Sequence, residues 1–403
     1  MLSWLGNVAF ACCRPDPIVR IMNMDDDDKR LDASSLASLF WGRDLGKHSF
    51  GDFSIAVVQA NDVIEDHSQV ETAQDATFVG IYDGHGGPNA SRFVSKHLFH
   101  NLFRLALEKG TISEDVLRRA VIATENEFLA LVRKTFGTNP LIAAVGTCCL
   151  IGVIWEGTLY VANLGDSRAV IGCLGKSKVV VAEQLTRDHN VGLEEVREEV
   201  RSLYPHDPSI VVEEGGTWRV KGLLQVSRAI GDAFMKQPEY YRNPLINAYY
   251  HIPEPFNRPV VTPEPSLNRR VLQPSDKFII FASDGLWEFL TNQQAVDIVV
   301  QYPRAGIAKR LVERALREAA KKRWMHFNKF MKLPKGKRRE FHDDITVVVI
   351  FIDPELLERE AFAPELSVSG FSDVVRPSSF SVMEVEEHDS SSSLELIFES
   401  VED

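Results

Sequence analysis

The residues in this sequence best suited to chemistry are acidic side chains beside glycine turns, at the borders of apolar, β-branched runs. Five short segments share this pattern. They are Glu65-Asp66, Asp83-Gly84-His85-Gly86-Gly87, Gly165-Asp166-Ser167-Arg168, Ser283-Asp284-Gly285-Leu286-Trp287-Glu288 and Asp343-Asp344. A single Asp-Gly pair is a common turn, but five such segments in one chain are difficult to explain as turns alone.

Strand ends are where rigid elements deliver side chains into a cleft. Carboxylates that converge there repel one another unless positive charge lies between them. Hard divalent cations with oxygen ligands supply that charge. A glycine after an aspartate lets the backbone turn tightly, and its carbonyl can then approach a metal. The segments therefore predict a divalent-cation site built mainly from carboxylates.

The stretches around these segments indicate both strands and helices. We expect strands at residues 54–59, 77–82, 147–155, 158–163, 168–172, 178–182, 277–283 and 345–352. We expect helices at residues 87–107, 113–136, 190–203, 292–301 and 307–323. Strands in clusters, with helices between the clusters, favour the α+β class over a doubly wound parallel sheet.

Composition divides the 403 residues into three parts. We expect an N-terminal arm and linker at residues 1–49, a catalytic domain at 50–353, and a disordered, acidic, serine-rich tail at 354–403. The tail carries 13 acidic residues against two arginines and accounts for most of the net charge of −12. This charge gives no bias toward nucleic acid, and no nucleic-acid partner is expected.

The cysteines and the N-terminus indicate in which cellular compartment the protein is expected. The five cysteines form no C-x-x-C motif, which favours a reducing compartment. The apolar N-terminus lacks a basic region and a cleavage site, so secretion is not expected. We expect the cytoplasm, the nucleus or both, with peripheral association at the plasma membrane as a further expectation.

The ordered set of motifs resembles the protein phosphatase 2C family. The resemblance covers about residues 50–353, and the sequence around the last motif is most similar to plant members of the clade linked to plasma-membrane proton-pump regulation. It is carried by Glu65-Asp66, Asp83-Gly84-His85-Gly86-Gly87, Gly146-Thr147, Gly165-Asp166-Ser167-Arg168, Ser227-Arg228-Ala229-Ile230-Gly231-Asp232, Ser283-Asp284-Gly285-Leu286-Trp287 and Asp343-Asp344-Ile345-Thr346.

This resemblance implies a four-layer α+β sandwich: two stacked antiparallel sheets flanked by helices, with the metal site in the cleft at one end. It implies a monomeric phosphoprotein phosphatase that hydrolyses phosphoserine and phosphothreonine through water activated by two Mg²⁺ or Mn²⁺ ions. Phosphoprotein substrates are then the expected partners, together with small regulatory proteins and an anionic membrane surface.

The resemblance also assigns roles to individual residues. Asp83 would bridge two metals, Gly84 would offer its carbonyl, and Asp284 and Asp343 would complete the first metal. Glu65 would hold the second metal through water that Asp66 orients. Asp166, Asp284 and Glu288 would form a weaker third site, although the family usually has aspartate where Glu288 stands. His85 would be the general acid.

One position departs from the family. Four residues before the glutamate, where an arginine commonly grips the substrate phosphate, this sequence has Asn61. Either another cation such as Arg43 or Lys47 replaces the arginine, or phosphate binding is weaker. The alternative function is therefore a weakly active, phosphate-binding pseudophosphatase scaffold. A second alternative is a two-metal hydrolase that acts on small phosphoesters.

Two segments have open interpretations. Residues 190–221 occupy the place of a variable flap beside the family's active site, but an ordinary loop and surface helix fit equally. Residues 321–339 are strongly basic with interleaved aromatics. They fit a solvated helix face and loop, a nuclear-localisation or anionic-lipid patch or, least well, nucleic-acid binding. The family resemblance favours a structural insert with a targeting role.

Overall fold

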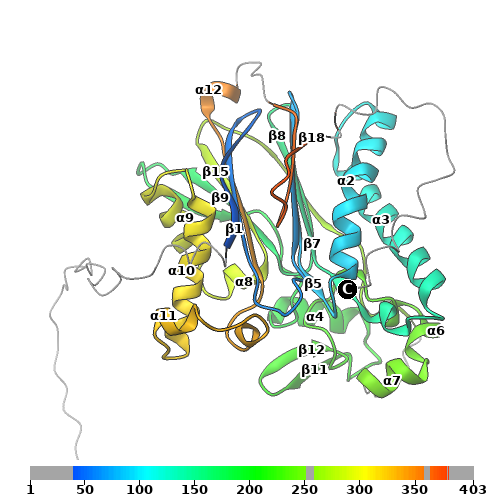
Figure 1. Ribbon diagram of the computed structural model, residues 1–403. Helices are drawn as coiled ribbons and strands as arrows, with labels where there is room; N and C mark the ends of the chain where they lie inside the picture. Colours follow the sequence, from blue (N-terminus) through cyan, green and yellow to red (C-terminus); the bar gives the residue numbers. More distant parts are fainter. Residues whose placement is uncertain (1–39, 251–257, 358–363, 379, 381–403) are drawn as a thin grey trace, which may run out of the picture.

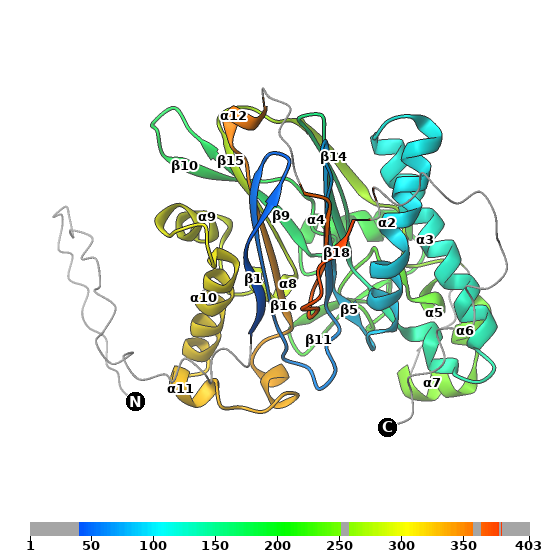
Figure 2. The same ribbon diagram turned by 45° about the horizontal axis from the view of Figure 1, so that its top comes forward.

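The computed structural model describes residues 40–250, 258–357, 364–378 and 380. Two antiparallel sheets stack face to face, with helices against both outer faces (Figures 1 and 2). Helices α9 (Asn292–Gln301) and α10 (Ile307–Lys322) cover one sheet, and α2 (Asn89–Lys109) and α3 (Glu114–Thr135) cover the other. The α+β four-layer sandwich expected from the sequence is confirmed.

The first sheet has six antiparallel strands in the order β1-β2-β16-β15-β9-β10. Every residue of β2 and β16 is buried, because the second sheet covers one face of these strands and α10 covers the other. This two-sided burial explains the nearly continuous apolar run of β16 and of the second half of β2, Ile55–Val58. The strands are β1 (Phe40–His48), β2 (Gly51–Val58), β9 (Arg168–Leu174), β10 (Val180–Gln184), β15 (Asp276–Ala282) and β16 (Ile345–Phe351).

The second sheet has seven antiparallel strands in the order β14-β8-β7-β4-β3-β17-β18. They are β3 (His67–Thr72), β4 (Ala76–Tyr82), β7 (Cys149–Trp155), β8 (Thr158–Leu164), β14 (Ser266–Val271), β17 (Leu366–Ser369) and β18 (Arg376–Pro377). Side chains from both sheets, among them Ile55, Ile81 and Phe281, form one buried cluster between the layers.

Smaller elements complete the fold. A three-stranded ribbon joins β5 (Gly84–His85), β6 (Gly146–Thr147) and β13 (Ile230–Gly231), and β11 (Val211–Glu214) pairs with β12 (Thr217–Val220). The remaining α-helices are α4 (Glu194–Leu203), α5 (Ala233–Lys236), α6 (Pro238–Tyr241), α7 (Pro244–Tyr250), α8 (Asp284–Trp287), α11 (Phe327–Phe330) and α12 (Pro354–Leu357). The 3₁₀ helices are η2 (Pro140–Ala144) and η3 (Lys337–Glu340).

Local sequence explains where the helices begin. Ser113 precedes α3 and accepts a hydrogen bond from the Val116 backbone N–H, which satisfies a donor that the helix itself leaves unpaired. Thr291 and Gln294 form a reciprocal capping box at the start of α9. No helix among the described residues has the length and apolar character needed to cross a bilayer.

The folded domain extends past both boundaries expected from the sequence. At the N-terminal side, β1 pairs with β2, so residues 40–48 belong to the first sheet rather than to an arm. At the C-terminal side, β17 pairs with β3, and Val368 is buried between the sheets. The expected disorder of residues 354–403 is therefore wrong for β17. Side chains alternate between the two faces of a strand, and in β17 this alternation places Val368 in the core. Residues 1–39 and 381–403 lie outside the described part.

The basic segment at residues 321–339 is an ordered insert. Phe330, in α11, is fully buried against the core around α10, and Met331 packs beside it. Arg338, in η3, is buried and donates hydrogen bonds to the carbonyls of Leu333 and Gln59. Phe330, Met331 and Arg338 therefore fit the interpretation as a structural insert. Trp324 does not pack on the core, because it is 98% exposed.

Candidate active site

The acidic residues predicted from the sequence lie where strands of both sheets end. Asp83 follows β4 and Asp166 follows β8, both in the second sheet. Asp284 opens α8 directly after β15, and Asp343 precedes β16, both in the first sheet. Figure 1 places β5 and α8 at the same end of the sandwich. The fold thus brings side chains distant in sequence to one end.

The pKa shifts of these carboxylates reflect both burial and mutual repulsion. Burial, followed by the charges of Asp284 and other carboxylates, raises the pKa of Asp83 well above its usual value. Burial and the charges of Asp166 and Asp343 do the same for Asp284. Burial also raises the pKa of Asp343 to about 6. Such shifts arise where carboxylates gather without a compensating cation.

The donor set fits a hard divalent cation. Asp284 Oδ1 is buried and has no hydrogen-bond partner among the described residues. Ligand atoms of Asp83, Cys148 and Asp166 all lie within 4.8 Å of one another. A buried carboxylate oxygen without a donor is costly, and a metal ion would remove that cost as well as the mutual repulsion.

Glu65 and Gly84 lie side by side at this end. The Glu65 backbone carbonyl accepts a hydrogen bond from Ser91 Oγ at 2.5 Å. A Cβ added at Gly84 would lie 2.6 Å from that carbonyl oxygen and 2.7 Å from Ser91 Oγ. Only glycine therefore fits at this position. Burial raises the pKa of the Glu65 carboxyl, and the charge of Asp343 raises it further.

Asp66 lies deeper than the other acids. Its Oδ2 accepts hydrogen bonds from Ser283 Oγ at 2.8 Å and Thr346 Oγ1 at 2.7 Å. Burial and the charge of Asp344 raise its pKa well above the usual value. Two hydroxyl donors thus fix the orientation of this carboxylate. That orientation is compatible with a group that positions a ligand of the metal site.

Asp344 organises the loop after β2, a role that sequence reasoning missed. Its carboxylate accepts hydrogen bonds from the backbone N–H groups of Ala60 (2.6 Å), Asn61 (3.1 Å) and Glu65 (2.8 Å). The Asp-Asp pair in the sequence indicated two carboxylates, but it did not indicate that the two have different roles. Asp343 faces the cluster, while Asp344 holds the loop that carries Asn61 and Glu65.

The Asn61 side chain is turned toward carboxylates. Its Nδ2 lies 3.4 Å from Glu65 Oε2, 3.3 Å from Asp343 Oδ1 and 3.2 Å from Asp344 Oδ2. Of the cations considered for this role, Lys47 instead pairs with Asp52 at 2.6 Å. Asp52 is the second residue of β2, whereas Asn61 follows the end of that strand. Lys47 therefore lies at the opposite end of β2 from Asn61.

His85 is held by Asp232, a second residue whose role sequence reasoning missed. His85 Nε2 lies 2.9 Å from Asp232 Oδ2, and the Asp232 side chain is fully buried. Burial lowers the pKa of His85, but the charge of Asp232 and its hydrogen bond raise that pKa by more, so the net pKa lies above 6.5. A Cβ on Gly146 would collide with both side chains, so this pair requires glycine there.

Asp166 and Glu288, predicted for a third metal site, have different surroundings. Asp166 Oδ1 accepts a hydrogen bond from Cys148 Sγ at 3.3 Å, and Oδ2 accepts one from Asn190 Nδ2 at 2.7 Å. Burial raises the pKa of the Cys148 thiol well above its usual value, so this thiol remains a donor. The Glu288 charge contributes to the raised pKa values of Asp284 and Asp343.

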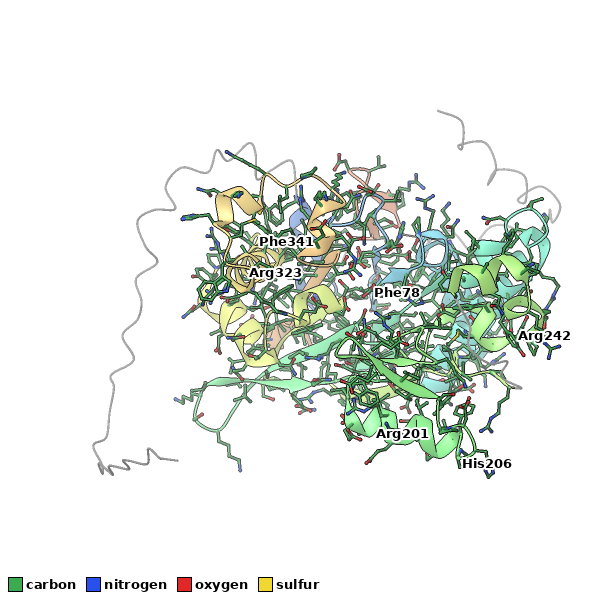
Figure 3. All side chains as sticks on the ribbon, turned by 90° about the horizontal axis from the view of Figure 1, so that it is seen from below. Phe78, Arg201, His206, Arg242, Arg323 and Phe341 are labelled. Atoms are coloured by element: carbon green, nitrogen blue, oxygen red, sulfur yellow. The ribbon has the colours of Figure 1, made fainter. Side chains whose placement is uncertain are left out.

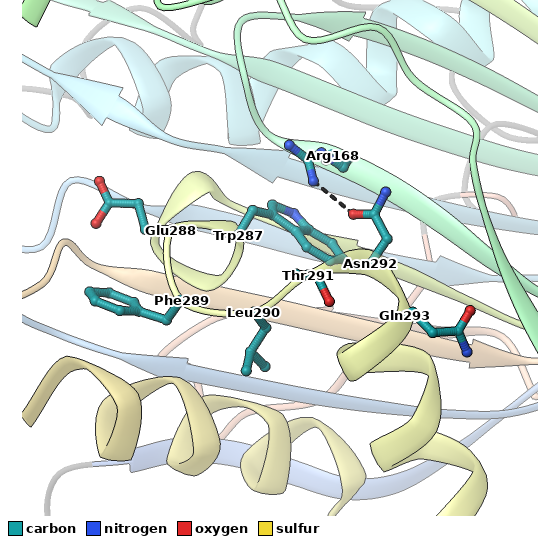
Figure 4. Close-up of a pocket in the computed structure, with 8 residues that line it drawn as sticks. All are labelled: Arg168, Trp287, Glu288, Phe289, Leu290, Thr291, Asn292 and Gln293. Carbon is teal, nitrogen blue, oxygen red and sulfur yellow. Dashed lines mark hydrogen bonds between the residues drawn. The ribbon is translucent and has the colours of Figure 1, made fainter. Parts of the chain in front are cut away.

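A surface cavity of about 530 Å³ adjoins the cluster through Glu288. Its wall includes Arg168, whose Nη1 donates a hydrogen bond to Asn292 Oδ1 at 2.7 Å (Figure 4). Figure 4 shows the Glu288 carboxylate pointing away from these two residues. Among the clustered carboxylates, Glu288 alone is part of the wall, so the cavity lies beside the cluster rather than over it.

Two segments frame this end of the sandwich. Figure 3 views the molecule from below, with Arg323 and Phe341 in the region of the basic insert on one side and Arg201 and His206 of the 190–221 segment on another. That segment forms α4 and the β11–β12 hairpin. Asn190, at its start, contacts Asp166 directly. The segment is therefore attached to the carboxylate cluster, as the flap interpretation requires.

Together, the stacked sheets and the carboxylate cluster define a hydrolase of the metal-dependent type. Residues 44–324 match the family described as Protein phosphatase 2C. The chain is 59% identical over 391 residues to "Probable protein phosphatase 2C 68" of Arabidopsis thaliana, which covers 95% of this chain and 99% of the relative. It is 58% identical to "Probable protein phosphatase 2C 43" of Oryza sativa subsp. japonica, with 94% and 98% covered. The chain belongs to the protein phosphatase 2C family.

A solved structure supports the same fold. The serine-threonine phosphatase 2C from Toxoplasma gondii aligns with a TM-score of 0.56 at 19% identity, covering 78% of this chain and 99% of that chain. With the family established, the protein is a metal-dependent serine/threonine protein phosphatase, and its substrates are phosphoproteins. Nothing in the comparisons favours the pseudophosphatase alternative.

Proposed function

We propose that the chain hydrolyses phosphoserine and phosphothreonine in proteins with two Mg²⁺ or Mn²⁺ ions held by the carboxylate cluster. The observation that carries this proposal is the convergence of Asp83, Asp284 and Asp343, from two different sheets, with raised pKa values. Oxygen ligands of this kind suit Mg²⁺ and Mn²⁺.

The ligands are assigned as the family resemblance suggests. Asp83 would hold both ions, Asp284 and Asp343 would complete the first, Glu65 would hold the second through water, and Gly84 would offer its carbonyl. Asp166, Asp284 and Glu288 are proposed for a weaker third ion. When bound, such ions lower the pKa of a coordinated water and neutralise charge on the phosphoryl oxygens. Asp66, held by two hydroxyls, orients the ligands on the side of Glu65.

The acid in this proposal is His85. The charge of Asp232 and its hydrogen bond raise the pKa of His85, which favours the protonated ring, and a protonated ring can donate to the departing serine or threonine oxygen. Asp232 bonds Nε2, which leaves Nδ1 as the ring nitrogen available to the leaving group. An alkoxide leaving group needs that proton, whereas an aryl oxide leaves readily without it. The contrast between these two substrates therefore tests the assignment.

Phosphate release from a phosphothreonine peptide, with Mn²⁺ and with EDTA, tests this proposal. We expect turnover in Mn²⁺ and none in EDTA, and Asp83→Asn should abolish it. Asp75→Asn is the matched control, because exposed Asp75 lies just before β4 and Asp83 just after it. Full turnover in EDTA, or equal losses in both variants, would contradict a role for the cluster. Turnover of aryl phosphates but not of peptides would favour the small-phosphoester alternative.

We further propose a monomer in the cytoplasm, the nucleus or both, peripherally bound to the plasma membrane and regulated by small proteins, without a nucleic-acid partner. The end of α10 supports the membrane part, because Trp324 is 98% exposed beside Lys321, which is 81% exposed. Tryptophan and lysine side chains suit an anionic interface. Placement in the clade linked to proton-pump regulation stays a prediction.

Flotation with phosphatidylserine vesicles tests the membrane proposal. Trp324→Ala should reduce the bound fraction, while Leu107→Ala, which removes an exposed apolar side chain of α2, should not. Equal binding by both variants and the unchanged protein would refute the assignment of this surface. Light scattering during gel filtration tests the monomer, and a dimer mass would contradict it.

A further inference from the structure

We propose that Arg339, in the basic insert, binds the phosphate group of the substrate at the edge of the metal site. This inference rests on the proposed function and deepens it, because it assigns a contact that the cluster itself does not supply. A phosphate monoester enters with up to two negative charges. The proposed ions would offset part of that charge, but the side chains around them are carboxylates, so a cation at the rim would strengthen phosphate binding.

The position of Arg339 meets this need. Its Nη2 lies 2.7 Å from Asp343 Oδ2, and its side chain is 51% exposed. On the other side of the same carboxylate, Asn61 Nδ2 lies 3.3 Å from Oδ1. Asp343 is thus bracketed by a neutral amide and a guanidinium. Of these two groups, only Arg339 has a charge to offer an incoming anion.

The insert holds Arg339 in place through its neighbours. Buried Arg338 donates hydrogen bonds to the Leu333 and Gln59 carbonyls at 2.9 and 3.1 Å. The Gly336 backbone N–H donates to the Ala60 carbonyl at 2.7 Å. Gln59 and Ala60 lie just before Asn61, on the loop that also carries Glu65. The insert is therefore fastened to the loop of the metal site, and a group so fastened is preorganised for binding.

The ion pair with Asp343 does not prevent this role. A guanidinium has five N–H donors in a planar fork, more than one carboxylate oxygen uses, and the fork matches phosphate geometry. A metal bound to Asp343 would also draw on that carboxylate's charge and so weaken its attraction for Arg339. By contrast, Arg168 is occupied elsewhere, by bonds to Asp188 and Asn292. Arg339 thus combines exposure, charge and proximity to the cluster.

The test uses inorganic phosphate as the probe and calorimetry of the Mn²⁺-loaded protein as the readout. Arg339→Ala should weaken phosphate binding by about tenfold or more, since a charge-assisted contact is lost. Arg339→Lys should lie between, because lysine keeps the charge but not the fork. Mn²⁺ affinity, measured separately without phosphate, should be unchanged or tighter, because a positive charge beside a ligand is removed. With phosphopeptide, KM should rise more than kcat falls.

Lys337→Ala is the matched control, because Lys337 lies in the same η3 helix, is 68% exposed and pairs with Glu340 rather than with the cluster. This control should bind phosphate as the unchanged protein does. Should Arg339→Ala fold poorly, Arg339→Gln keeps side-chain amide donors without the charge and should show the same loss. Unchanged phosphate affinity in the Arg339 variants would overturn the inference. So would equal losses in Lys337→Ala, or a parallel loss of Mn²⁺ affinity.

The inference and the proposed function fail in different ways. If the unchanged Mn²⁺-loaded protein neither binds phosphate nor hydrolyses phosphopeptide, the proposed function is wrong and the inference falls with it. If the unchanged protein does both and Arg339→Ala binds phosphate equally well, the function stands and Arg339 is not a phosphate ligand.

Discussion

Replacing Asp343 with asparagine should stabilise the metal-free protein while removing the stabilisation that metal gives. Burial raises the pKa of the Asp343 carboxyl from 3.8 to about 6, so its ionised form is unfavourable in the folded state. Asparagine keeps an Oδ1 that can accept from the Asp344 N–H and Asn61 Nδ2, as Asp343 does now. The change therefore removes charge from the cluster and leaves those two hydrogen bonds in place.

The magnitude follows from the pKa. Each pKa unit corresponds to about 1.36 kcal/mol, so a shift of roughly two units costs the folded, metal-free state about 3 kcal/mol at pH 7. The variant loses its half-exposed ion pair with Arg339 at 2.7 Å, but that attraction is already contained in the net pKa of Asp343. The expected gain therefore stays at about 3 kcal/mol, or roughly 6 °C in Tm for a large domain.

The direction of the Asp343 pKa shift also predicts how the stability difference depends on pH. The folded-state pKa of Asp343 lies above the unfolded value, so the cost is present above about pH 6 and absent below about pH 4. The advantage of Asp343→Asn in EDTA should therefore be largest near pH 7 and vanish near pH 4.

Thermal unfolding in EDTA and in excess Mn²⁺ provides the assay. Mn²⁺ should raise the Tm of the unchanged protein, because a Mn²⁺ concentration of 100 times Kd adds about 2.7 kcal/mol of stability. The Tm of Asp343→Asn should rise much less. Asp75→Asn should behave as the unchanged protein in both buffers. A lower Tm for Asp343→Asn in EDTA, or an undiminished response to Mn²⁺, would refute the reasoning.

Three further predictions concern other parts of the molecule. His85→Ala should reduce phosphopeptide turnover by ~10²–10⁴ and aryl phosphate turnover by less, with Asp232→Asn shifting both the same way; equal losses on both substrates would count against His85 as the acid. Burial lowers the pKa of His48 to about 4, below the unfolded value of 6.5, so the protein should lose about 2 kcal/mol of stability between pH 6.5 and 5 through this residue. Urea unfolding should show a smaller loss for His48→Gln, and an identical loss would exclude His48 as a cause. Deleting residues 364–403 removes β17 and buried Val368 and should lower Tm by several degrees more than deleting residues 381–403; equal Tm values for the two truncations would show that β17 contributes little.

Continuous apolar runs made the central strands predictable. The runs at 277–283 and 345–352 correspond to β15 and β16, which have neighbours on both faces. Edge strands gave weaker signals. β1 contains two glycines and four charged or histidine side chains, and β17 is a four-residue strand in an acidic segment. Their pairing depends on strands distant in sequence, which local patterns do not report.

The candidate active site likewise has a part that the sequence predicts and a part that it does not. Acidic residues beside glycines at strand ends could be found from the sequence, because the turn chemistry is local. The partnership of His85 with Asp232 spans 147 positions, and the hold of Asp344 on Ala60 spans 284. Both pairings exist only once the sheets have stacked. Arg339 and Asp343 are only four residues apart in sequence. Whether Arg339 lies beside the carboxylate cluster nevertheless depends on the contacts that hold η3 against the loop after β2.

The most direct test of the central claim is to locate the metal. Crystals grown with Mn²⁺ and measured at the manganese absorption edge should show two strong anomalous peaks among Asp83, Glu65, Asp284 and Asp343. In crystals of Asp83→Asn these peaks should be lost or strongly reduced. Absence of any peak from the cluster in the unchanged protein, or peaks only elsewhere on the surface, would contradict a catalytic metal site built from these carboxylates.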